Sequence, residues 1–591
     1  MVLSILPFGL FILSISNILY LSAISVLTNW IPSTFEIIIF RVICLLVTGL
    51  AMKKYYRNFR VEKIGKEWMM ITPFLLITLI RFPLVYPTYD DLAAHMMWGD
   101  YANRLWQNTN FMPMNFLQYF YLPLDMNYTP FLYTVGLRIT IWLFYLLTSV
   151  WMVSLYIRLS REVKTKTQKL LLSILFIILP FIPHLLGVSG TLMGDYASLA
   201  FCLEALYLFM AKKTNKTFAM IMTLTAILVK QSNSIFVAPI LIYYAVLNRK
   251  NIEWSKVVAY ALIAGLFFGR LYLETGNALS GLFNGIFQSP LYAPGNFAQT
   301  NFGPQTFWQT LVWPIIGQFG ERYAEGIVST SAKIFYAPLP IIGYGVSLWL
   351  MARKRSLKYG LLVLTYLLWS HLVGYARYYI ALNLMALIVM IFDLRSKWFM
   401  DNGQWSMWMQ RYKYLILGLV FLGSFSSLKT DFSWRPHPSI KTPGANDYYF
   451  GEYKAGLLLV GRDTLPNIAR QYKDLFSQYG AVVTIYRGPV TFISYMGYLN
   501  GLPVYDGVPQ LQYNSILNNP KIGADIKNNL RASSSHDTVI ILADKPNDTQ
   551  APLLQIYQDL VCERIGVATK DAYLQRKIYF AETIMFSCVR P

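Results

Sequence analysis

Two adjacent carboxylates, Asp90 and Asp91, directly follow an apolar segment and precede an aromatic-rich run. Neighbouring carboxylates at a membrane boundary repel each other and are costly to desolvate, so they persist beside a counterion or where a base is needed. The alternative is an exposed helix cap, because Asp before Leu-Ala-Ala-His95 is a favourable helix start. The aromatic loop that follows could anchor at the interface or stack a sugar ring, and it favours a functional role.

A third acid and three cations also stand in or beside apolar segments. Asp195 ends the run Ser-Gly-Thr-Leu-Met-Gly-Asp, and Lys230 follows a long apolar stretch. Arg377 lies in Tyr-Ala-Arg-Tyr-Tyr, and Arg81 precedes the first long loop. Ionisable residues in membrane segments are costly, so each is a candidate for function. The alternatives are a helix cap for Asp195 and snorkelling to the headgroups for the cations, above all for Arg81.

His95 lies four residues after Asp91, which places both on one face if a helix forms there. A zinc site needs several Cys or His ligands, and neither a Cys nor a second His stands nearby. A capping or packing role for His95 is therefore favoured over a metal pair. The sequence indicates neither a Ser-His-Asp arrangement nor a P-loop.

The composition is that of a polytopic membrane protein, because 55% of the 591 residues are hydrophobic and 14% are charged. A net charge of +21 would indicate nucleic-acid binding in a soluble protein, but here Lys and Arg cluster in short loops between apolar segments. Nucleic-acid binding is therefore excluded. Among the four cysteines, Cys562 and Cys588 lie in the polar tail, where they form either a disulfide in an oxidising compartment or two free thiols.

Apolar runs predict a polytopic α-helical fold of about 13 transmembrane helices, since one span needs roughly 20 apolar residues. They lie near residues 3–28, 34–52, 68–85, 131–157, 169–188, 192–211, 217–230, 234–248, 256–273, 334–352, 359–372, 376–393 and 413–428. We expect a transmembrane domain over 1–428 that contains a long outer loop at 86–130. The tail, 429–591, is expected to be a soluble α/β domain, because strand-like runs at 456–460, 481–486 and 537–543 accompany a helical pattern that ends at Gly480.

Basic residues divide the loops into two alternating sets. The loops around 53–66, 158–169, 212–216, 249–256, 353–358 and 395–413 are rich in Lys and Arg, whereas those at 29–33, 86–130 and 274–331 hold almost none. By the positive-inside rule the basic loops are cytoplasmic. The amino terminus is then expected inside, and Asp90, Asp91 and the tail are expected outside.

The stretch Thr217–Leu247 is too long for one span, and both flanks are basic, so the chain must enter the membrane and return. Two legs of about 14 residues rise only about 21 Å each, short of the ~30 Å hydrocarbon core. The junction around Lys230 is therefore expected below the outer surface, where irregular polar backbone has to line a cavity.

The order and shared sidedness of these motifs resemble the GT-C superfamily of integral membrane glycosyltransferases, which use polyprenyl-phosphate-linked sugars. The resemblance covers roughly residues 68–393, and the layout is similar to that of the lipid A aminoarabinose transferases and the protein mannosyltransferases. One departure is that two apolar helices precede the helix leading into the acidic loop, where many members have one. The motifs that carry the resemblance are Asp90-Asp91, Asp195, the run from Leu228-Val-Lys230 to Pro239, and the run from Arg377 to Leu382.

The resemblance implies an inverting hexosyl- or pentosyltransferase on the outer face of a bacterial cytoplasmic membrane. Its acceptor would be a cell-envelope glycan, lipid or protein. Asp90, with Asp91 beside it, would act as the general base in the loop 86–130. The donor phosphate would be bound by three cations, Lys230, Arg377 and Arg81.

The resemblance leaves two roles open for the other acidic site residues. Asp91 and Asp195, with His95 as support, would either orient the acceptor or hold a divalent cation such as Mg²⁺ or Mn²⁺ through oxygen ligands. No other cofactor is expected.

Two other classes of function remain open on the sequence. A polysaccharide polymerase or ligase also has many spans, but it would rely on several arginines in large outer loops, and the loop 274–331 has only Arg322. A transporter or flippase of lipid-linked glycans is indicated by the interrupted segment at Lys230, but the sequence shows no internal symmetry.

Overall fold

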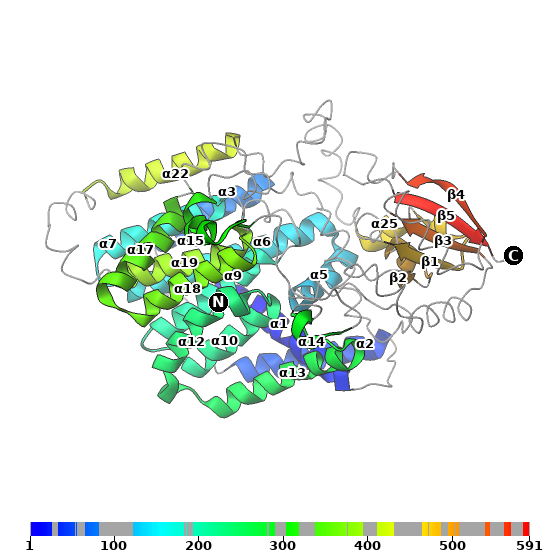
Figure 1. The fold of residues 1–591 in the computed structure, drawn as a ribbon, viewed down its shortest axis with the longest axis horizontal. Coiled ribbons are helices and arrows are strands. Elements are labelled where there is room, and N and C mark those ends of the chain that lie inside the picture. Colours follow the sequence, from blue (N-terminus) through cyan, green and yellow to red (C-terminus); the bar gives the residue numbers. More distant parts are fainter. Residues whose placement is uncertain are drawn as a thin grey trace.

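A computed structural model gives the fold of the chain (Figure 1). The structure describes residues 2–26, 34–53, 55, 66–81, 122–182, 185, 192, 194–279, 283–289, 303–317, 336, 338–374, 376–393, 411–430, 464–470, 472–485, 495–502, 504–506, 538–543, 561–568 and 583–589. Helices make up the part up to residue 430, and a sheet lies near the carboxyl terminus.

A described helix overlaps each of the 13 predicted apolar segments. In chain order these helices are α1 (Val2–Val26), α2 (Thr34–Met52), α3 (Ile71–Arg81), α6 (Leu137–Glu162), α7 (Lys166–Ile178), α9 (Asp195–Met210), α10 (Lys216–Val229), α12 (Ala238–Leu247), α13 (Trp254–Thr275), α17 (Pro338–Lys354), α18 (Leu357–Leu372), α19 (Ala376–Asp393) and α22 (Lys413–Thr430). Shorter helices join them: α5 (Leu122–Thr134), α11 (Asn233–Phe236), α14 (Asn284–Phe287) and α15 (Phe307–Ile316).

Three of the described helices are long and apolar enough to cross a membrane, judged by length and composition. The qualifying stretches are Gly9–Val26, Phe35–Met52 and Ile139–Glu162. Large apolar side chains also stay exposed on the outside of the bundle, for example Leu50 of α2 and Leu273 of α13. Such exposure is expected of helices that face lipid. The number of further spans stays a prediction.

The predicted single helix over 131–157 is wrong in its amino-terminal part. The structure has two helices there, α5 and α6, and Gly136 separates them with a φ of 89°. Glycine adopts this φ without the steric cost that a side chain would add. The last part of the predicted loop 86–130 is therefore helical from Leu122 onward.

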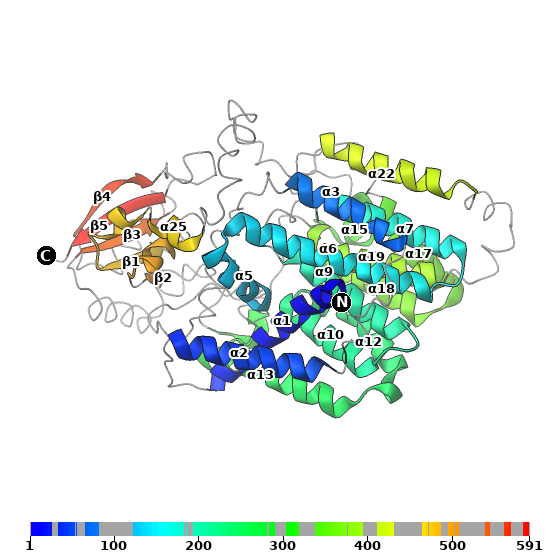
Figure 2. The ribbon, with the colours of Figure 1, turned by 180° about the vertical axis from the view of Figure 1, so that it is seen from behind.

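Helix α9 is the central element of the described bundle. It packs against α6, α10, α12 and α19, and both views show it enclosed by other helices (Figures 1 and 2). All of its residues except Met210 are buried, because the helix is apolar on every side apart from a few polar residues. Two of those residues are acids, Asp195 and Glu204, and their nine-residue spacing separates them by roughly 14 Å along the axis.

Glu204 forms a buried ion pair with Arg158 of α6. Both guanidinium nitrogens Nη1 and Nη2 donate to the carboxylate at 2.5 Å, and the indole of Trp151 donates to Oε2 at 3.0 Å. The guanidinium also lies over the ring of Tyr207, 4.8 Å from its centroid. The sequence predicts that Arg158 belongs to a basic loop, and this prediction is wrong. Arg158 is 4% exposed and belongs to α6, where Glu204 compensates its charge.

Lys216 is a second basic loop residue that the structure buries. Its ammonium donates to the carbonyl oxygens of Leu208 at 2.9 Å and Phe209 at 3.0 Å, in the last turn of α9. A cation is favourable at this end of a helix, where carbonyl groups lack partners and carry partial negative charge. Lys216 therefore caps α9 where the chain turns into α10.

The described part of the tail contains a five-stranded sheet with the order β2-β1-β3-β5-β4. Its strands are β1 (Ala481–Ile485), β2 (Val504–Asp506), β3 (Thr538–Ala543), β4 (Val561–Ala568) and β5 (Thr583–Val589). β1 is parallel to β2 and β3, whereas β5 is antiparallel to β3 and β4. Two short helices, α25 (Leu465–Arg470) and α26 (Lys473–Phe476), precede β1.

Two predicted strands, at 481–486 and 537–543, coincide with β1 and β3. The third predicted run, at 456–460, lies outside the described residues. The division of the chain into domains at residue 429 stays a prediction. The register of β4 and β5 places Cys562 directly opposite Cys588.

We predict that Glu204→Leu lowers the free energy of unfolding by about 3–5 kcal/mol, because it leaves the Arg158 guanidinium buried without its carboxylate. The double variant Arg158→Met/Glu204→Leu should recover most of that loss, since no charge is then left unpaired. Chemical unfolding of the purified chain in detergent, followed by tryptophan fluorescence, measures both.

The exposed pair of Lys169 and Glu67, 3.2 Å apart, provides the control. Glu67→Gln should cost at most about 1 kcal/mol, because water already screens that pair. Equal losses from Glu67→Gln and Glu204→Leu would contradict a structural role for the buried pair.

Candidate functional site

The candidate site forms where the predicted entering and returning segment is interrupted. α10 ends at Val229, Lys230 adopts an extended conformation, and a turn leads into α11 and α12. Short polar residues favour such a turn over a continuous helix, and Pro239 is compatible with the first turn of α12. The predicted interruption is confirmed. The 14 residues of α10 and the 10 of α12 give legs of roughly 21 and 15 Å.

Lys230 and Asp195 form a buried ion pair at this interruption. The Lys230 ammonium donates to Oδ1 of Asp195, and the two residues are each 5% exposed. The same ammonium lies over the ring of Tyr378, 4.7 Å from its centroid. The carboxylate and the aromatic ring together compensate the cost of burying a cation in an apolar bundle.

Neighbouring contacts hold the interruption in place. The side-chain amide of Asn233 donates to Oγ of Ser198 at 2.8 Å and to the carbonyl oxygen of Ala226 at 2.7 Å, which ties the turn to α9 and α10. The rings of Phe236 and Tyr378 meet edge to face, with centroids 6.4 Å apart. Lys230 is therefore fixed between three helices and does not lie in a loose loop.

Two helices begin beside the Lys230 ammonium. Asp195 is the first residue of α9, and Tyr378 is the third residue of α19. The amino-terminal end of a helix carries partial positive charge and unpaired N–H groups, which favour an anion. Asp195 at the start of α9 is the one described carboxylate paired with Lys230, and α19 contributes the Tyr378 ring from its first turn.

A tight crossing fixes the start of α19. Gly374 has a φ of 61°, and a Cβ at this position would lie 2.5 Å from the Cα of Gly303 and 2.9 Å from Nε1 of Trp313. The Trp313 indole donates to the Gly374 carbonyl oxygen at 2.8 Å. Helix α15, which carries Trp313, lies in the predicted outer loop 274–331 and thus helps to position Tyr378.

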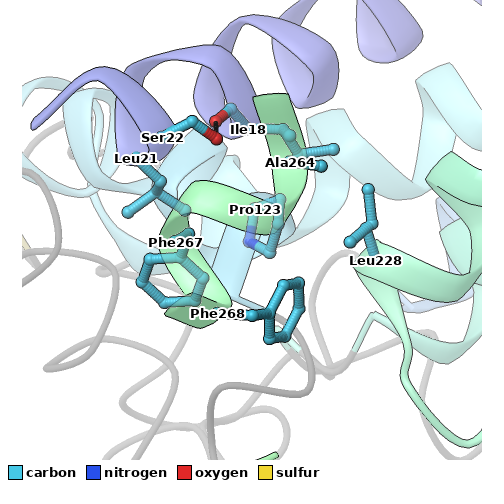
Figure 3. A pocket seen from close by; sticks show the side chains of 8 residues that line it. All are labelled: Ile18, Leu21, Ser22, Pro123, Leu228, Ala264, Phe267 and Phe268. Carbon is cyan, nitrogen blue, oxygen red and sulfur yellow. Dashed lines mark hydrogen bonds between the residues drawn. The ribbon is translucent and has the colours of Figure 1, made fainter. Parts of the chain in front are cut away.

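An apolar pocket lies between α1, α5, α10 and α13. Figure 3 shows the side chains that line it, and the space is about 300 Å³ including the part open to the outside. Its lining residues are Ile18, Leu21, Ser22, Pro123, Leu228, Ala264, Phe267 and Phe268. Leu228, in the last turn of α10, precedes Lys230 by two residues in the chain. The wall between α1 and α5 is held by Asn17, whose amide donates to the Pro123 carbonyl oxygen at 2.7 Å.

The structure brings together two of the residues singled out from the sequence, Asp195 and Lys230. Arg81 is the last residue of α3 and Arg377 is the second residue of α19, but the structure describes only their backbone positions. The remaining three, Asp90, Asp91 and His95, lie outside the described residues.

Sequence reasoning missed the contacts that depend on helix packing. Tyr378 stands in the Arg-Tyr-Tyr run, yet nothing in that run indicates that its ring would cover Lys230. Asn233 looked like an ordinary turn residue. Glu204 carried a usable signal, because an acid in the middle of an apolar segment demands a buried cation.

A divalent cation is a poor fit at Asp195. The Lys230 ammonium already contacts that carboxylate, and a second cation beside it would be repelled. Among the residues that the structure describes, no group of three or more His, Cys, Asp or Glu side chains could hold a metal ion.

No protein-family model matches the chain, and no curated protein matches it. Among solved structures, ArnT from Cupriavidus metallidurans bound to undecaprenyl phosphate is similar over 89% of this chain and 98% of that chain, with 10% identity and a TM-score of 0.44. The apo state of the same protein covers 88% and 97%, with 11% identity and a TM-score of 0.44. A likeness at this TM-score transfers neither a site nor a substrate.

We predict that Gly374→Ala destabilises the chain by about 1–3 kcal/mol, because the new Cβ is strained at this φ and meets the backbone of Gly303. Gly345→Ala is the matched control, since a Cβ there meets nothing within 4 Å in the middle of α17. The control should be neutral or slightly stabilising. Thermal unfolding in detergent compares the two, and equal midpoints would contradict the tight crossing.

Proposed function

We propose that the chain is a membrane glycosyltransferase that moves a sugar from a polyprenyl-phosphate donor to a cell-envelope glycan, lipid or protein acceptor. The observation that carries this proposal is the buried Lys230 ammonium at an interrupted helix, beside the amino-terminal ends of α9 and α19. A buried cation with two helix ends is suited to an anion such as a phosphate. The transfer would take place on the outer face of a bacterial cytoplasmic membrane.

The chemistry requires a base and a stabilised leaving group. An acceptor hydroxyl attacks the anomeric carbon, the bond from that carbon to the phosphate oxygen breaks, and the configuration inverts. Asp90 takes the proton of the hydroxyl as general base. The phosphate leaves with its negative charge and needs no proton, but it needs positive charge where its own charge develops, which Lys230, Arg377 and Arg81 supply.

In this proposal Asp195 does not bind the acceptor but pairs with Lys230. Its carboxylate pairs with the Lys230 ammonium and orients it before the donor binds. The incoming phosphate then competes with Asp195 for the ammonium. Acceptor orientation, or binding of Mg²⁺ or Mn²⁺, is left to Asp91 with His95.

The apolar pocket supports a lipid-linked donor. Its lining is almost entirely hydrocarbon, and it includes Leu228, which precedes Lys230 by two residues in the chain. A polyprenyl phosphate has an apolar chain joined to one anionic group. A polyprenyl chain would contact apolar side chains of this kind.

A lipid transporter or flippase is the second candidate, because an interrupted helix with a buried charge is also found where transporters bind substrates. The two functions differ in their products. Purified protein in liposomes that moves a polyprenyl-phosphate sugar across the bilayer without forming a transferred product would favour the transporter.

We predict that Asp90→Asn lowers the transfer rate by about 10²–10⁴-fold, because the amide cannot accept the proton. Asp100→Asn, in the same predicted loop, is the control and should keep near wild-type activity. Mass spectrometry of glycans and polyprenyl-phosphate sugars from cells with each variant provides the measurement, and loss of transfer should leave donor accumulated. Full transfer by Asp90→Asn would refute the assignment of the base.

A further inference from the structure

Two polar side chains at the interruption have no role in the chemistry above. Gln231 is 7% exposed, and its Oε1 atom is fully shielded from solvent, as is the Oγ atom of Ser232. Neither oxygen forms a hydrogen bond with any residue in the described part of the chain. Each therefore has a hydrogen-bonding capacity that the described protein leaves unused.

The backbone carbonyl groups of the same two residues, in contrast, do form hydrogen bonds. The carbonyl oxygen of Gln231 accepts from the Ser234 N–H at 2.9 Å, and that of Ser232 accepts from the N–H groups of Ile235 at 3.2 Å and Phe236 at 3.1 Å. Buried polar side chains without partners cost free energy and are uncommon in folded proteins. Here they stand next to a buried cation, where a ligand that brings its own polar groups would satisfy them.

The positions of Gln231 and Ser232 are fixed from both sides. Lys230 before them is held by Asp195 and Tyr378, and Asn233 after them is held by Ser198 and Ala226. A ligand that binds there does not have to order this segment first. Such preorganisation suits residues that discriminate between similar ligands.

We infer that Gln231 and Ser232 contact the sugar of the donor and determine which sugars are accepted. This inference rests on the proposed function. The Gln231 oxygen can only accept a hydrogen bond, so its partner must offer an O–H or N–H group. A polyprenyl phosphodiester offers no such group in its lipid chain or at its phosphate oxygens, whereas the sugar carries several hydroxyl groups or an amine. Removal of a group that hydrogen-bonds substrate hydroxyls typically relaxes discrimination.

The test measures lipid binding to the purified full chain by native mass spectrometry. The probes are undecaprenyl phosphate and its glucosyl, mannosyl and 4-amino-4-deoxyarabinosyl derivatives. Wild-type protein should bind at least one glycosyl lipid about tenfold more tightly than the bare lipid, as expected for one added hydrogen bond to a buried group. Gln231→Met, which has a similar shape, should abolish that preference and leave binding of the bare lipid unchanged.

Two further variants complete the design. Ser232→Ala should weaken the same preference, whereas Ser234→Ala, at an exposed position of the same turn, should retain it. Thermal unfolding in the absence of lipid checks folding. A purely structural Gln231 would give a more stable Gln231→Met protein with its sugar preference intact, and that result would overturn the inference. Equal affinity of the wild type for the bare lipid and all three glycosyl lipids would also overturn it.

Failure of the proposed function has a different signature. Lys230→Met should weaken binding of the bare lipid and of the glycosyl lipids alike, because the phosphate is common to all of them. If the wild type binds none of the four lipids, or if Lys230→Met binds bare undecaprenyl phosphate as tightly as the wild type, the phosphate site itself is refuted.

A separate observation concerns the sheet of the tail. β4 and β5 are antiparallel, and Cys562 and Cys588 are partners in their register, between the pairs Val561–Val589 and Glu563–Ser587. Residues directly opposite in antiparallel strands have Cα atoms roughly 4.5–5.5 Å apart. That spacing falls within the roughly 4.4–6.8 Å found across disulfides.

We propose that Cys562 and Cys588 form a disulfide. The two thiols lose two protons and two electrons and form one S–S bond, while a protein disulfide of the thiol-oxidising class outside the cytoplasm is reduced to a dithiol. The bond would link β4, an edge strand of the sheet, to its neighbour β5. Its formation requires an oxidising compartment, in agreement with the outer location expected for the tail.

The test alkylates whole cells with iodoacetamide before lysis and analyses the full chain by peptide mass spectrometry without reduction. One linked peptide pair containing Cys562 and Cys588 is expected, and it should separate after reduction. Cys44 and Cys202 are buried free thiols and should be alkylated only after denaturation, which provides an internal control. Recovery of Cys562 and Cys588 as separately alkylated or reduced peptides would refute the disulfide.

Discussion

The charge compensation between Lys230 and Asp195 is the interaction on which the candidate site depends. Either charge alone would be costly inside an apolar bundle, and the loss of one would leave the other without a partner. The pair joins the start of α9 to the interruption after α10, and the ring of Tyr378 adds the start of α19. Three segments that are distant in sequence therefore meet at one buried cation.

Helix α9 relates this site to the rest of the bundle. Its two acids pair with cations on different helices, Asp195 with Lys230 and Glu204 with Arg158. One pair lies at the amino-terminal end, where a phosphate could compete for the cation. The other is enclosed by Trp151 and Tyr207 and serves packing. The two ion pairs share the same chemistry and differ in their surroundings, which is why the proposed function assigns binding to one pair and a structural role to the other.

The sequence predicted the helices well, because long apolar runs determine where membrane helices form. It also predicted the interruption at Lys230, because two basic flanks required the chain to turn back. The burial of individual charged residues and their contacts between helices were less predictable. Arg158 and Lys216 looked like loop residues, and only the packing of α6 and α9 shows that they are buried. Gly136 interrupts what reads as one continuous apolar run, since its φ of 89° is a property of the fold. Asp90 and Asp91 remain predictions from the sequence.

The spacing of the buried pairs also has a consequence for biogenesis. Asp195 and Lys230 are 35 residues apart: Asp195 begins α9, and Lys230 directly follows the next helix, α10. A helical hairpin leaving the insertion machinery can therefore neutralise both charges before either reaches lipid. Arg158 of α6 pairs with Glu204, which lies 46 residues later in the chain. The charge of Arg158 is therefore not compensated until α9 packs against α6. Both cations therefore depend on α9 for their partners, since neither ion pair can form before this helix has been synthesised.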